Sequence, residues 1–245
     1  MNRKTILVTG AARRVGSAIA RALHATGANI LVHYHLASEA AAALVAELNL
    51  ARPSSAACLQ ADLRQVETSP QLVASTIDRF GRLDALVNNA SSFFPTPFGS
   101  IDVAAWNELL DSNLKAPLFL TQAAAPHLAD SRGAVVNITD IHAERPLAGY
   151  PLYCAAKAGL LGLTRALAIE LAPLVRVNAV APGPILWPES DLFDSAARAE
   201  ILAHTLLQRA GCPRDIAHAV RYLLEDAAYV TGQVINVDGG RTAHL

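Results

Sequence analysis

Apolar, β-branched runs recur along the chain at intervals that leave room for a helix between each pair. Their near-continuous hydrophobicity is typical of strands covered on both faces, as in a parallel sheet. The runs lie at residues 5–9, 29–34, 57–60, 85–87, 134–138, 176–180 and 234–237. Between them apolar residues repeat at helical spacing, for example Val15, Ile19 and Leu23. The pattern predicts a single α/β domain over residues 1–245, a doubly wound sheet of about seven parallel strands with helices on both faces.

Composition narrows the classes of protein and partner. Of the 245 residues 52% are hydrophobic and 17% charged, so a well-packed globular domain is expected. The formal net charge of −1 gives no electrostatic reason to expect nucleic acid or a membrane as partner. Cys58, Cys154 and Cys212 lie far apart and match no metal-ligand spacing, so we expect reduced thiols and no metal. The first apolar run is too short for a signal-peptide core, which favours a cytoplasmic protein.

The turn after the first predicted strand has the composition of a phosphate-binding turn. It reads TGAARRVG at residues 9–16 and leads into the first predicted helix. Glycine lets the backbone approach a pyrophosphate, and the helix N-terminus offers free N–H groups and the positive end of its dipole. Two glycines alone are a weak signal, since many strand–helix turns contain them without binding anything. Position in the first strand–helix unit favours a dinucleotide.

The end of the second predicted strand indicates which dinucleotide binds. An acid there would bind the adenosine ribose of NAD and repel a 2′-phosphate, but residues 33–38 read HYHLAS and the first acid is Glu39. Arg13 and Arg14 add two cations in the adjoining turn, so we expect NADPH. The alternative, solvated arginines, fits poorly at an N-terminus that is already positive by its dipole. Asp62, after the third strand, is either an acceptor for the adenine amino group or a plain surface aspartate.

Tyr153 and Lys157 are the candidate catalytic pair. Four residues apart on a predicted helix, they share one face. A tyrosine can donate a proton during hydride transfer if a nearby ammonium lowers its pKa from about 10 toward neutrality. The surrounding helix is rich in Ala, Leu and Gly, which makes a chance surface pair the weaker interpretation. Asn113, in a predicted helix interior where asparagine is mildly unfavourable, is expected to have a polar role nearby.

These segments together resemble the short-chain dehydrogenase/reductase superfamily over essentially the whole chain. The shared motifs are the turn at 9–16, NNA at 88–90, Asn113, the Tyr153/Lys157 pair, PG at 182–183 and the TG…VDGG segment at 231–240. Within the superfamily the chain is most similar to pteridine reductases. The segments specific to them are RR at 13–14, HYH at 33–35, NASSFFPTP at 89–97, and Asp140 followed by PLAGY at 146–150. The resemblance implies a Rossmann-like fold and NADPH-dependent reduction of a pterin.

The resemblance also implies roles for single residues. Lys157 would hydrogen-bond the nicotinamide ribose, and Asn113 would support a water chain to that lysine. Phe93 would stack the pterin opposite the nicotinamide, and Ser91 would contact polar groups of cofactor or substrate. The implied cofactor-binding set is Gly10, Arg13, Arg14, Val15, His33, Tyr34, His35, Asp62, Leu63, Asn89, Ala90, Ser91, Tyr153, Lys157, Pro182 and Gly183.

Two positions depart from the superfamily pattern. Arg14 replaces the middle glycine of the phosphate turn, as it does in pteridine reductases. Leu36 stands where a further arginine is expected after the HYH run, which leaves the 2′-phosphate fewer cations.

Asp140 indicates the substrate class. It stands thirteen residues before Tyr153, where most superfamily members have a serine whose hydroxyl donates to a substrate carbonyl. An ionised carboxylate cannot donate, and it repels the oxyanion that forms when a ketone takes hydride. Pterins instead present N–H donors and C=N bonds whose nitrogen must be protonated, which a carboxyl group beside Tyr153 can relay. An aspartate that merely caps a loop is the alternative.

Three functions remain in view. The first is reduction of 7,8-dihydropterins by NADPH, with oxidised pterins and dihydrofolate as further substrates, and with Ser91, Phe93, Asp140 and Tyr153 at the substrate. The second is a general carbonyl or 3-oxoacyl reductase of the same superfamily. The third is a catalytically silent NADP-binding regulator, which has no need of the intact Asn113, Tyr153 and Lys157.

Two further features concern surfaces. The segment 182–209 opens with PGP and contains Trp187, and it is predicted to be a loop and a helix that cover the site and carry substrate selectivity. The predicted helices at 106–128 and 152–171 are apolar nearly all round, more than one sheet face can cover. Together with the apolar strand near the C-terminus and the resemblance, they predict a homotetramer.

Overall fold

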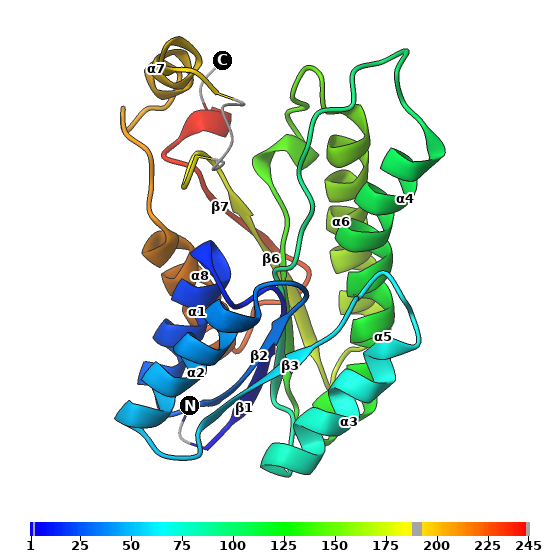
Figure 1. Ribbon diagram of the computed structural model, residues 1–245, viewed down its shortest axis with the longest axis vertical. Helices are drawn as coiled ribbons and strands as arrows, with labels where there is room; N and C mark the ends of the chain where they lie inside the picture. Colours follow the sequence, from blue (N-terminus) through cyan, green and yellow to red (C-terminus); the bar gives the residue numbers. More distant parts are fainter. Residues whose placement is uncertain (2, 188–192, 244–245) are drawn as a thin grey trace.

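The computed structural model describes residues 1, 3–187 and 193–243, and there the predicted architecture is confirmed. Within this part of the chain one sheet of seven parallel strands runs in the order β3-β2-β1-β4-β5-β6-β7 (Figure 1). The strands are β1 (Thr5–Val8), β2 (Asn29–Tyr34), β3 (Ala56–Gln60), β4 (Ala85–Asn88), β5 (Ala134–Ile138), β6 (Arg176–Pro182) and β7 (Val234–Val237). The first three strands are added from β1 outward to β3, and β4 then lies on the other side of β1, so the order of strand addition reverses between β1 and β4. Ligands of such sheets bind at this reversal, beyond the carboxyl ends of the strands.

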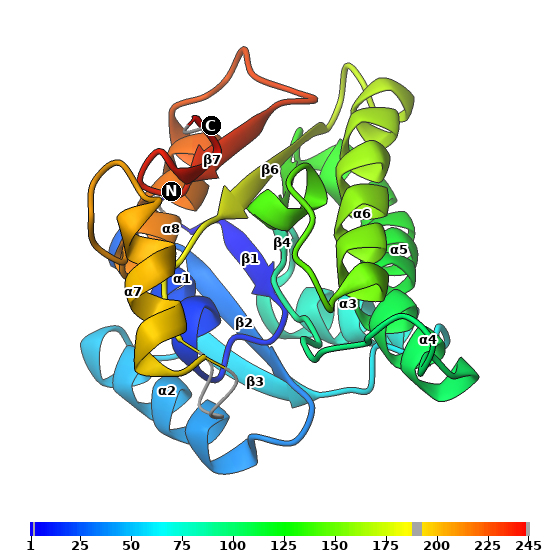
Figure 2. The ribbon, with the colours of Figure 1, turned by 90° about the horizontal axis from the view of Figure 1, so that it is seen from above.

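Helices cover both faces of the sheet, as Figure 2 shows from above. One face carries α1 (Arg14–Ala25), α2 (Ser38–Ala51) and α8 (Pro213–Glu225). The other carries α3 (Thr68–Phe80), α5 (Ala116–Asp130) and α6 (Pro151–Glu170). Alternate residues of each strand serve the two faces: Ile6 and Val8 pack with the first helix layer and Leu7 with the second, all three fully buried. Burial on both sides explains why the strands are hydrophobic without alternation.

The apolar segment at 106–128 is not one continuous helix. α4 (Val103–Leu110) passes into a π-helical turn, Asp111–Lys115, before α5 begins. Asn113 lies in this turn and is fully buried. A π-turn releases backbone groups from the regular ladder and is found mostly at functional sites. The interruption therefore explains how a buried asparagine is accommodated in a helical segment.

α6 brings the candidate catalytic pair to the sheet. It packs against β6 and against η2, a short 3₁₀ turn at Ile141–Ala143. By length and composition alone it is the one helix of the described residues that is able to cross a membrane, but half of that stretch is buried inside the protein. Tyr153 and Lys157 lie on its buried side.

The segment 182–209 contains α7 (Ser195–Ala203), which stands beside the carboxyl ends of the strands (Figure 1). Ile201 of α7 and Trp187 line the cleft described below. Residues 188–192 of this segment lie outside the described residues. Its role in substrate selectivity stays a prediction.

Candidate active site

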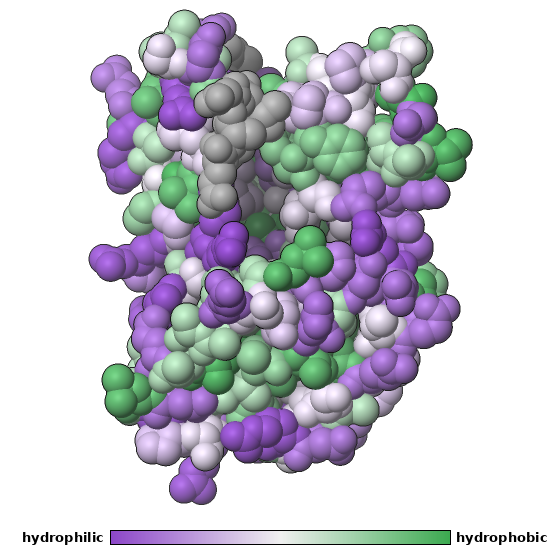
Figure 3. All heavy atoms as spheres, in the orientation of Figure 1, coloured by the Kyte–Doolittle hydropathy of each residue, from purple (hydrophilic) through white to green (hydrophobic). Residues whose placement is uncertain are grey.

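A cleft of about 740 Å³ opens over the carboxyl ends of the strands. Figure 3 shows the molecule hollowed between the side that carries α7 and the side that carries α4. The cleft is lined by residues from both halves of the sheet, so it lies at the reversal of strand order. Every residue predicted for cofactor, substrate or catalysis lines it except Tyr34 and Asn113.

The phosphate turn is built from two close backbone approaches. Gly10 has φ +59°, and a Cβ there would lie 2.9 Å from the Cα of Ala90. A Cβ at Gly16 would lie 2.3 Å from the Gly10 carbonyl oxygen. The Asn89 side chain donates to the carbonyl oxygens of Thr9 (2.8 Å) and Gly10 (3.2 Å) and so ties the turn to the end of β4. Any side chain at either glycine would displace the turn.

α1 begins directly behind this turn. Its N-cap residue, Arg13, has an extended backbone and makes no side-chain capping bond among the described residues. Arg13, Arg14 and Val15 line the cleft at this helix N-terminus. A tight glycine turn that leads into a helix N-terminus, with the positive end of its dipole toward the cleft, fits a pyrophosphate. These residues thus fit the dinucleotide expected from the sequence.

Arg14 bridges the cleft. Its φ of +53° lies in the left-handed region that favours glycine, at the position where the superfamily pattern has one. The guanidinium donates to the carbonyl oxygens of Leu186 (3.2 Å) and Trp187 (3.1 Å). The side chain therefore connects the phosphate turn to the segment that opens after β6. Its contact with a 2′-phosphate stays a prediction.

His33 has a structural use. The Gly10 N–H donates to its Nδ1 (3.1 Å), while its Nε2 lies 3.1 Å from the Ala61 carbonyl oxygen. Burial lowers the pKa of His33 to about 4, so the ring is neutral at pH 7. With Nδ1 accepting, the proton sits on Nε2 and is donated to Ala61. The ring therefore holds the phosphate turn against β2, while Tyr34 packs against the apolar core and His35 lines the cleft.

Asp140 and Tyr153 are in direct contact. The Tyr153 hydroxyl donates to Asp140 Oδ2 at 2.7 Å, and Asp140 Oδ1 accepts from the backbone N–H of His142 at 2.8 Å. The bond from His142 to Oδ1 caps η2, as the loop-capping interpretation expects. The other oxygen, Oδ2, holds the Tyr153 hydroxyl, as the functional interpretation expects. Asp140 also lines the cleft, as Tyr153 does.

The pKa of Tyr153 is raised well above its usual value, so the expectation of a phenol lowered toward neutrality is wrong for this structure. Burial is the largest cause and the negative charge of Asp140 is the next. Burial also lowers the pKa of Lys157 to about 8, with Asp140 opposing that shift. The lysine Nζ lies 5.7 Å from the centre of the Tyr153 ring and donates to the Ile138 carbonyl oxygen at 3.0 Å. Tyr153 is therefore a neutral phenol that carries a proton.

Asn113 lies behind the wall of the cleft and holds its serines. Its Oδ1 accepts from the Ser91 hydroxyl at 2.6 Å, and its Nδ2 donates to the carbonyl oxygens of Ser92 (2.9 Å) and Leu109 (3.0 Å). The polar role expected for Asn113 is thus to fix the segment at 91–93. The implied water chain from Asn113 to Lys157 stays a prediction.

Phe93 is surrounded by two tyrosines. Tyr150 stacks on its ring with centroids 4.7 Å apart and planes at 9°, and Tyr153 meets it edge-on at 4.8 Å. Tyr150 is one of the residues that the sequence argument left without a role. It is the N-cap residue of α6, directly before the helix that carries Tyr153, which brings both rings to Phe93.

Other residues of the cleft come from distant segments, and three of them were not singled out in the sequence. These are Arg64 and Glu108, which pair in the wall of the cleft, and Arg241, which stands near α7 and donates to the Ile201 carbonyl oxygen at 2.7 Å. Leu147 and Trp187, from the segments at 146–150 and 182–209, add apolar walls. No spacing pattern relates these positions along the chain, so the fold alone brings them together.

Comparison with known proteins adds the family context. A family model described as enoyl-(acyl carrier protein) reductase matches residues 10–242. Pteridine reductase 1 of Leishmania tarentolae is 40% identical over 96% of this chain and 94% of its own. A 3-oxoacyl-acyl-carrier-protein reductase of Synechocystis sp. is 40% identical over 96% of this chain and 95% of its own, and one of Staphylococcus aureus is 35% identical over 97% of each. Overall identity therefore does not separate the two kinds of reductase.

Proposed function

The chain belongs to the short-chain dehydrogenase/reductase family and is an oxidoreductase, and we propose that it reduces dihydropterins with NADPH as the hydride donor. The observation that carries the proposal is the carboxylate of Asp140 at 2.7 Å from the Tyr153 hydroxyl, inside the cleft. The family membership alone leaves the substrate open, and the chemistry of this pair is what favours a pterin.

A carboxylate in this place suits a pterin better than a ketone. Hydride transfer to a ketone builds negative charge on its oxygen, which Asp140 would repel and to which it has no proton to donate when ionised. A pterin presents amino and ring N–H groups, for which a carboxylate is the natural acceptor. The dihydropterin C=N bond takes hydride at carbon and a proton at nitrogen, so the site needs a proton donor close to an acceptor.

Different residues of the cleft have different roles in this reaction. Bound NADPH supplies the hydride, and Asp62 and the turn at Gly10 are the groups expected to hold its adenosine and pyrophosphate. Tyr153 is protonated in the ligand-free cleft because its pKa is raised, and it is the group expected to donate a proton to the substrate nitrogen, with the ammonium of Lys157 offsetting the cost of forming the phenolate. Asp140 Oδ2 accepts from the phenol before the transfer and from a pterin N–H afterwards. Lys157 faces the Tyr153 ring and stabilises the phenolate left behind.

Phe93 supports the same assignment through shape. Its ring lines the cleft, and one of its faces is covered by Tyr150. A planar bicyclic substrate would stack on the opposite face, where aromatic rings typically gain about 0.5–1.5 kcal/mol beyond area burial. An acyl chain has no comparable use for a ring stack.

Reduction of 3-oxoacyl thioesters is the second candidate. It is favoured by the family model that matches residues 10–242 and by a relative with the same 40% identity as the pteridine reductase. The two candidates are distinguished by NADPH oxidation followed with 7,8-dihydrobiopterin, dihydrofolate and a 3-oxoacyl thioester, and by identifying the tetrahydro product by chromatography. Turnover of the thioester without any reduced pterin product would replace the first candidate by the second.

NADPH is expected to be preferred over NADH. Arg13 and Arg14 lie at the phosphate turn, and β2 does not end on an acid that would repel the 2′-phosphate. Arg14→Ala is expected to raise the Michaelis constant for NADPH several-fold and to leave that for NADH nearly unchanged, as steady-state kinetics at fixed ionic strength will show. Arg21→Ala serves as the control, because Arg21 lies on α1 like Arg14 and its exposed ion pair is with Glu47 of α2. Equal efficiency of the parent with both cofactors would contradict the assignment.

The protein is expected to be a homotetramer. α6 keeps Ile169 78% exposed, and Trp106 on α4 is 52% exposed, which leaves an apolar face outside the sheet. β7 is an edge strand with its apolar side chains half-buried, a second surface that another copy can cover. Light scattering at micromolar concentration is expected to give four times the chain mass. A monomer mass would rule the assembly out.

A further inference from the structure

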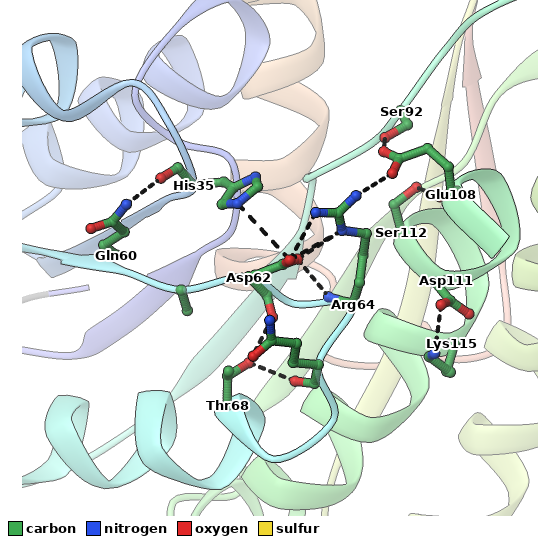
Figure 4. A network of polar contacts seen from close by, with 12 residues as sticks. His35, Gln60, Asp62, Arg64, Thr68, Ser92, Glu108, Asp111, Ser112 and Lys115 are labelled. Atoms are coloured by element: carbon green, nitrogen blue, oxygen red, sulfur yellow. Dashed lines mark hydrogen bonds and ion pairs between the residues drawn. The ribbon is translucent and has the colours of Figure 1, made fainter. Parts of the chain in front are cut away.

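A line of charged and polar side chains crosses the wall of the cleft from one ligand region to the other (Figure 4). At one end Asp62 and Arg64 follow β3, in the part of the cleft where the adenine is expected. At the other end Ser92 stands next to Phe93, where the pterin is expected. Glu108 of α4 lies between them.

The contacts along this line are continuous. Arg64 holds Asp62 with two side-chain nitrogens, Nε on Oδ1 at 2.9 Å and Nη2 on Oδ2 at 2.8 Å. Its remaining terminal nitrogen, Nη1, donates to Glu108 Oε2. The other oxygen of that carboxylate, Oε1, accepts from the Ser92 hydroxyl at 2.6 Å. We call Arg64, Glu108 and Ser92 the brace.

The brace ends on the segment that carries the substrate ring. Asn113 already fixes the Ser91 hydroxyl and the Ser92 carbonyl from behind. The hydrogen bond from the Ser92 hydroxyl to Glu108 is a further contact that orients this segment from the side of α4. Phe93 follows directly and is also held by Tyr150 and Tyr153, so loosening Ser92 leaves the ring with less support.

The two ion pairs of Arg64, with Asp62 and with Glu108, are partly exposed to solvent. The bonds from Arg64 hold the pKa of Asp62 at about 2, and the Ser92 hydroxyl together with Arg64 lowers the pKa of Glu108. The side chains of Arg64, Glu108 and Asp62 are 39%, 33% and 20% exposed. Water at such exposure weakens ion pairs, and covering them with a ligand strengthens them.

We propose that Arg64 and Glu108 are positioning residues through which occupation of the adenine region orders the Ser92–Phe93 segment and tightens pterin binding. The proposal rests on the proposed function for the identity of the two ligands. An adenosine over Asp62 excludes water from the two ion pairs, so Glu108 is held more firmly and Ser92 with it. Less of the pterin's binding free energy is then lost to ordering Phe93, so the pterin binds more tightly. The two regions are therefore positively coupled.

The test uses 2′,5′-ADP, which fills the adenine region and has no nicotinamide to touch the pterin. In the parent, saturating 2′,5′-ADP is expected to lower the dissociation constant of 7,8-dihydrobiopterin about fivefold, the low end for coupled sites. It is also expected to slow hydrogen exchange of the amides at 91–93 by a similar factor, with no pterin present. Both effects are expected to vanish in Glu108→Gln, which keeps the length of the side chain and loses its charge.

Two variants distinguish coupling through the brace from a general loss of structure. Ser92→Ala cuts the brace at its far end while both ion pairs stay, and it is expected to abolish the same two effects. Asp111→Asn removes an equivalent charge from the same helical segment, where Asp111 pairs with Lys115 at 2.7 Å away from the cleft (Figure 4), and it is expected to retain them.

The outcomes distinguish this proposal from the proposed function. Slower exchange at 91–93 with 2′,5′-ADP and no binding of any pterin would support the brace and remove the pterin assignment. Pterin binding that 2′,5′-ADP leaves unchanged, or the same coupling in Glu108→Gln as in the parent, would overturn the brace and leave the function standing. Failure of 2′,5′-ADP to bind would also overturn it.

Discussion

Tyr153→Phe is expected to lower the turnover of dihydropterin by about 10²-fold or more, with NADPH binding retained. The substitution keeps the ring, so the edge-on contact with Phe93 and the position of Lys157 beside the ring are preserved. It removes the one group of the pair that carries a proton in the ligand-free cleft, because Asp140 accepts from it. The loss therefore falls on the chemical step.

The measurement is single-turnover NADPH oxidation together with the dissociation constant of NADPH from fluorescence titration. Tyr150→Phe is the matched control, since it removes the phenol hydroxyl of the other ring beside Phe93, for which no bond to Asp140 is described. A Tyr153→Phe variant within a few-fold of the parent rate would mean that the proton comes from another group.

Asp140→Ser is expected to exchange one substrate preference for the other. The serine hydroxyl donates to a carbonyl oxygen and brings no charge, so the developing oxyanion of a ketone is no longer repelled. Reduction of dihydropterin is expected to fall by about 10-fold or more, because the pterin N–H loses its acceptor, and reduction of a simple ketone is expected to rise. The capping bond to His142 is short-range, and serine also caps helical turns well, so the fold should tolerate the change.

The profile of kcat/KM over the two substrate classes is the measurement. Asp140→Asn belongs beside it, because it keeps the shape and one acceptor oxygen, loses the charge and gains an N–H donor; it is expected to lower pterin reduction and, like serine, to relieve the repulsion of the ketone oxyanion. If Asp140→Ser reduces dihydropterin as well as the parent does, Asp140 takes no part in proton delivery.

Much of the fold follows from local pattern. Strands buried on both faces must be hydrophobic throughout, so the seven runs were visible in the sequence, and parallel strands leave their carboxyl ends at one edge. That edge is where Gly10, Asp62, Asn89, Asp140 and Lys157 meet. Each of them follows or faces a strand end, which is why sequence position alone predicts their convergence.

What escaped prediction depends on contacts between distant segments. Arg64 and Glu108 are 44 positions apart and meet only because β3 and α4 end on the same side of the cleft. The direction of the Tyr153 pKa was missed because a pairwise argument with Lys157 omits burial and the charge of Asp140. His33 lines the cleft, as expected of a cofactor-site residue, and that its neutral ring also accepts from the Gly10 N–H was not visible in the sequence.

The central claim is that a carboxylate beside the proton-donating tyrosine makes this reductase a pterin enzyme. The most direct test is the ratio of kcat/KM for 7,8-dihydrobiopterin to kcat/KM for a 3-oxoacyl thioester, measured on the parent protein with NADPH in one buffer. The account predicts a ratio well above one, by about 10²-fold, since a few kcal/mol of electrostatic preference separate the two transition states. A ratio below one would contradict it.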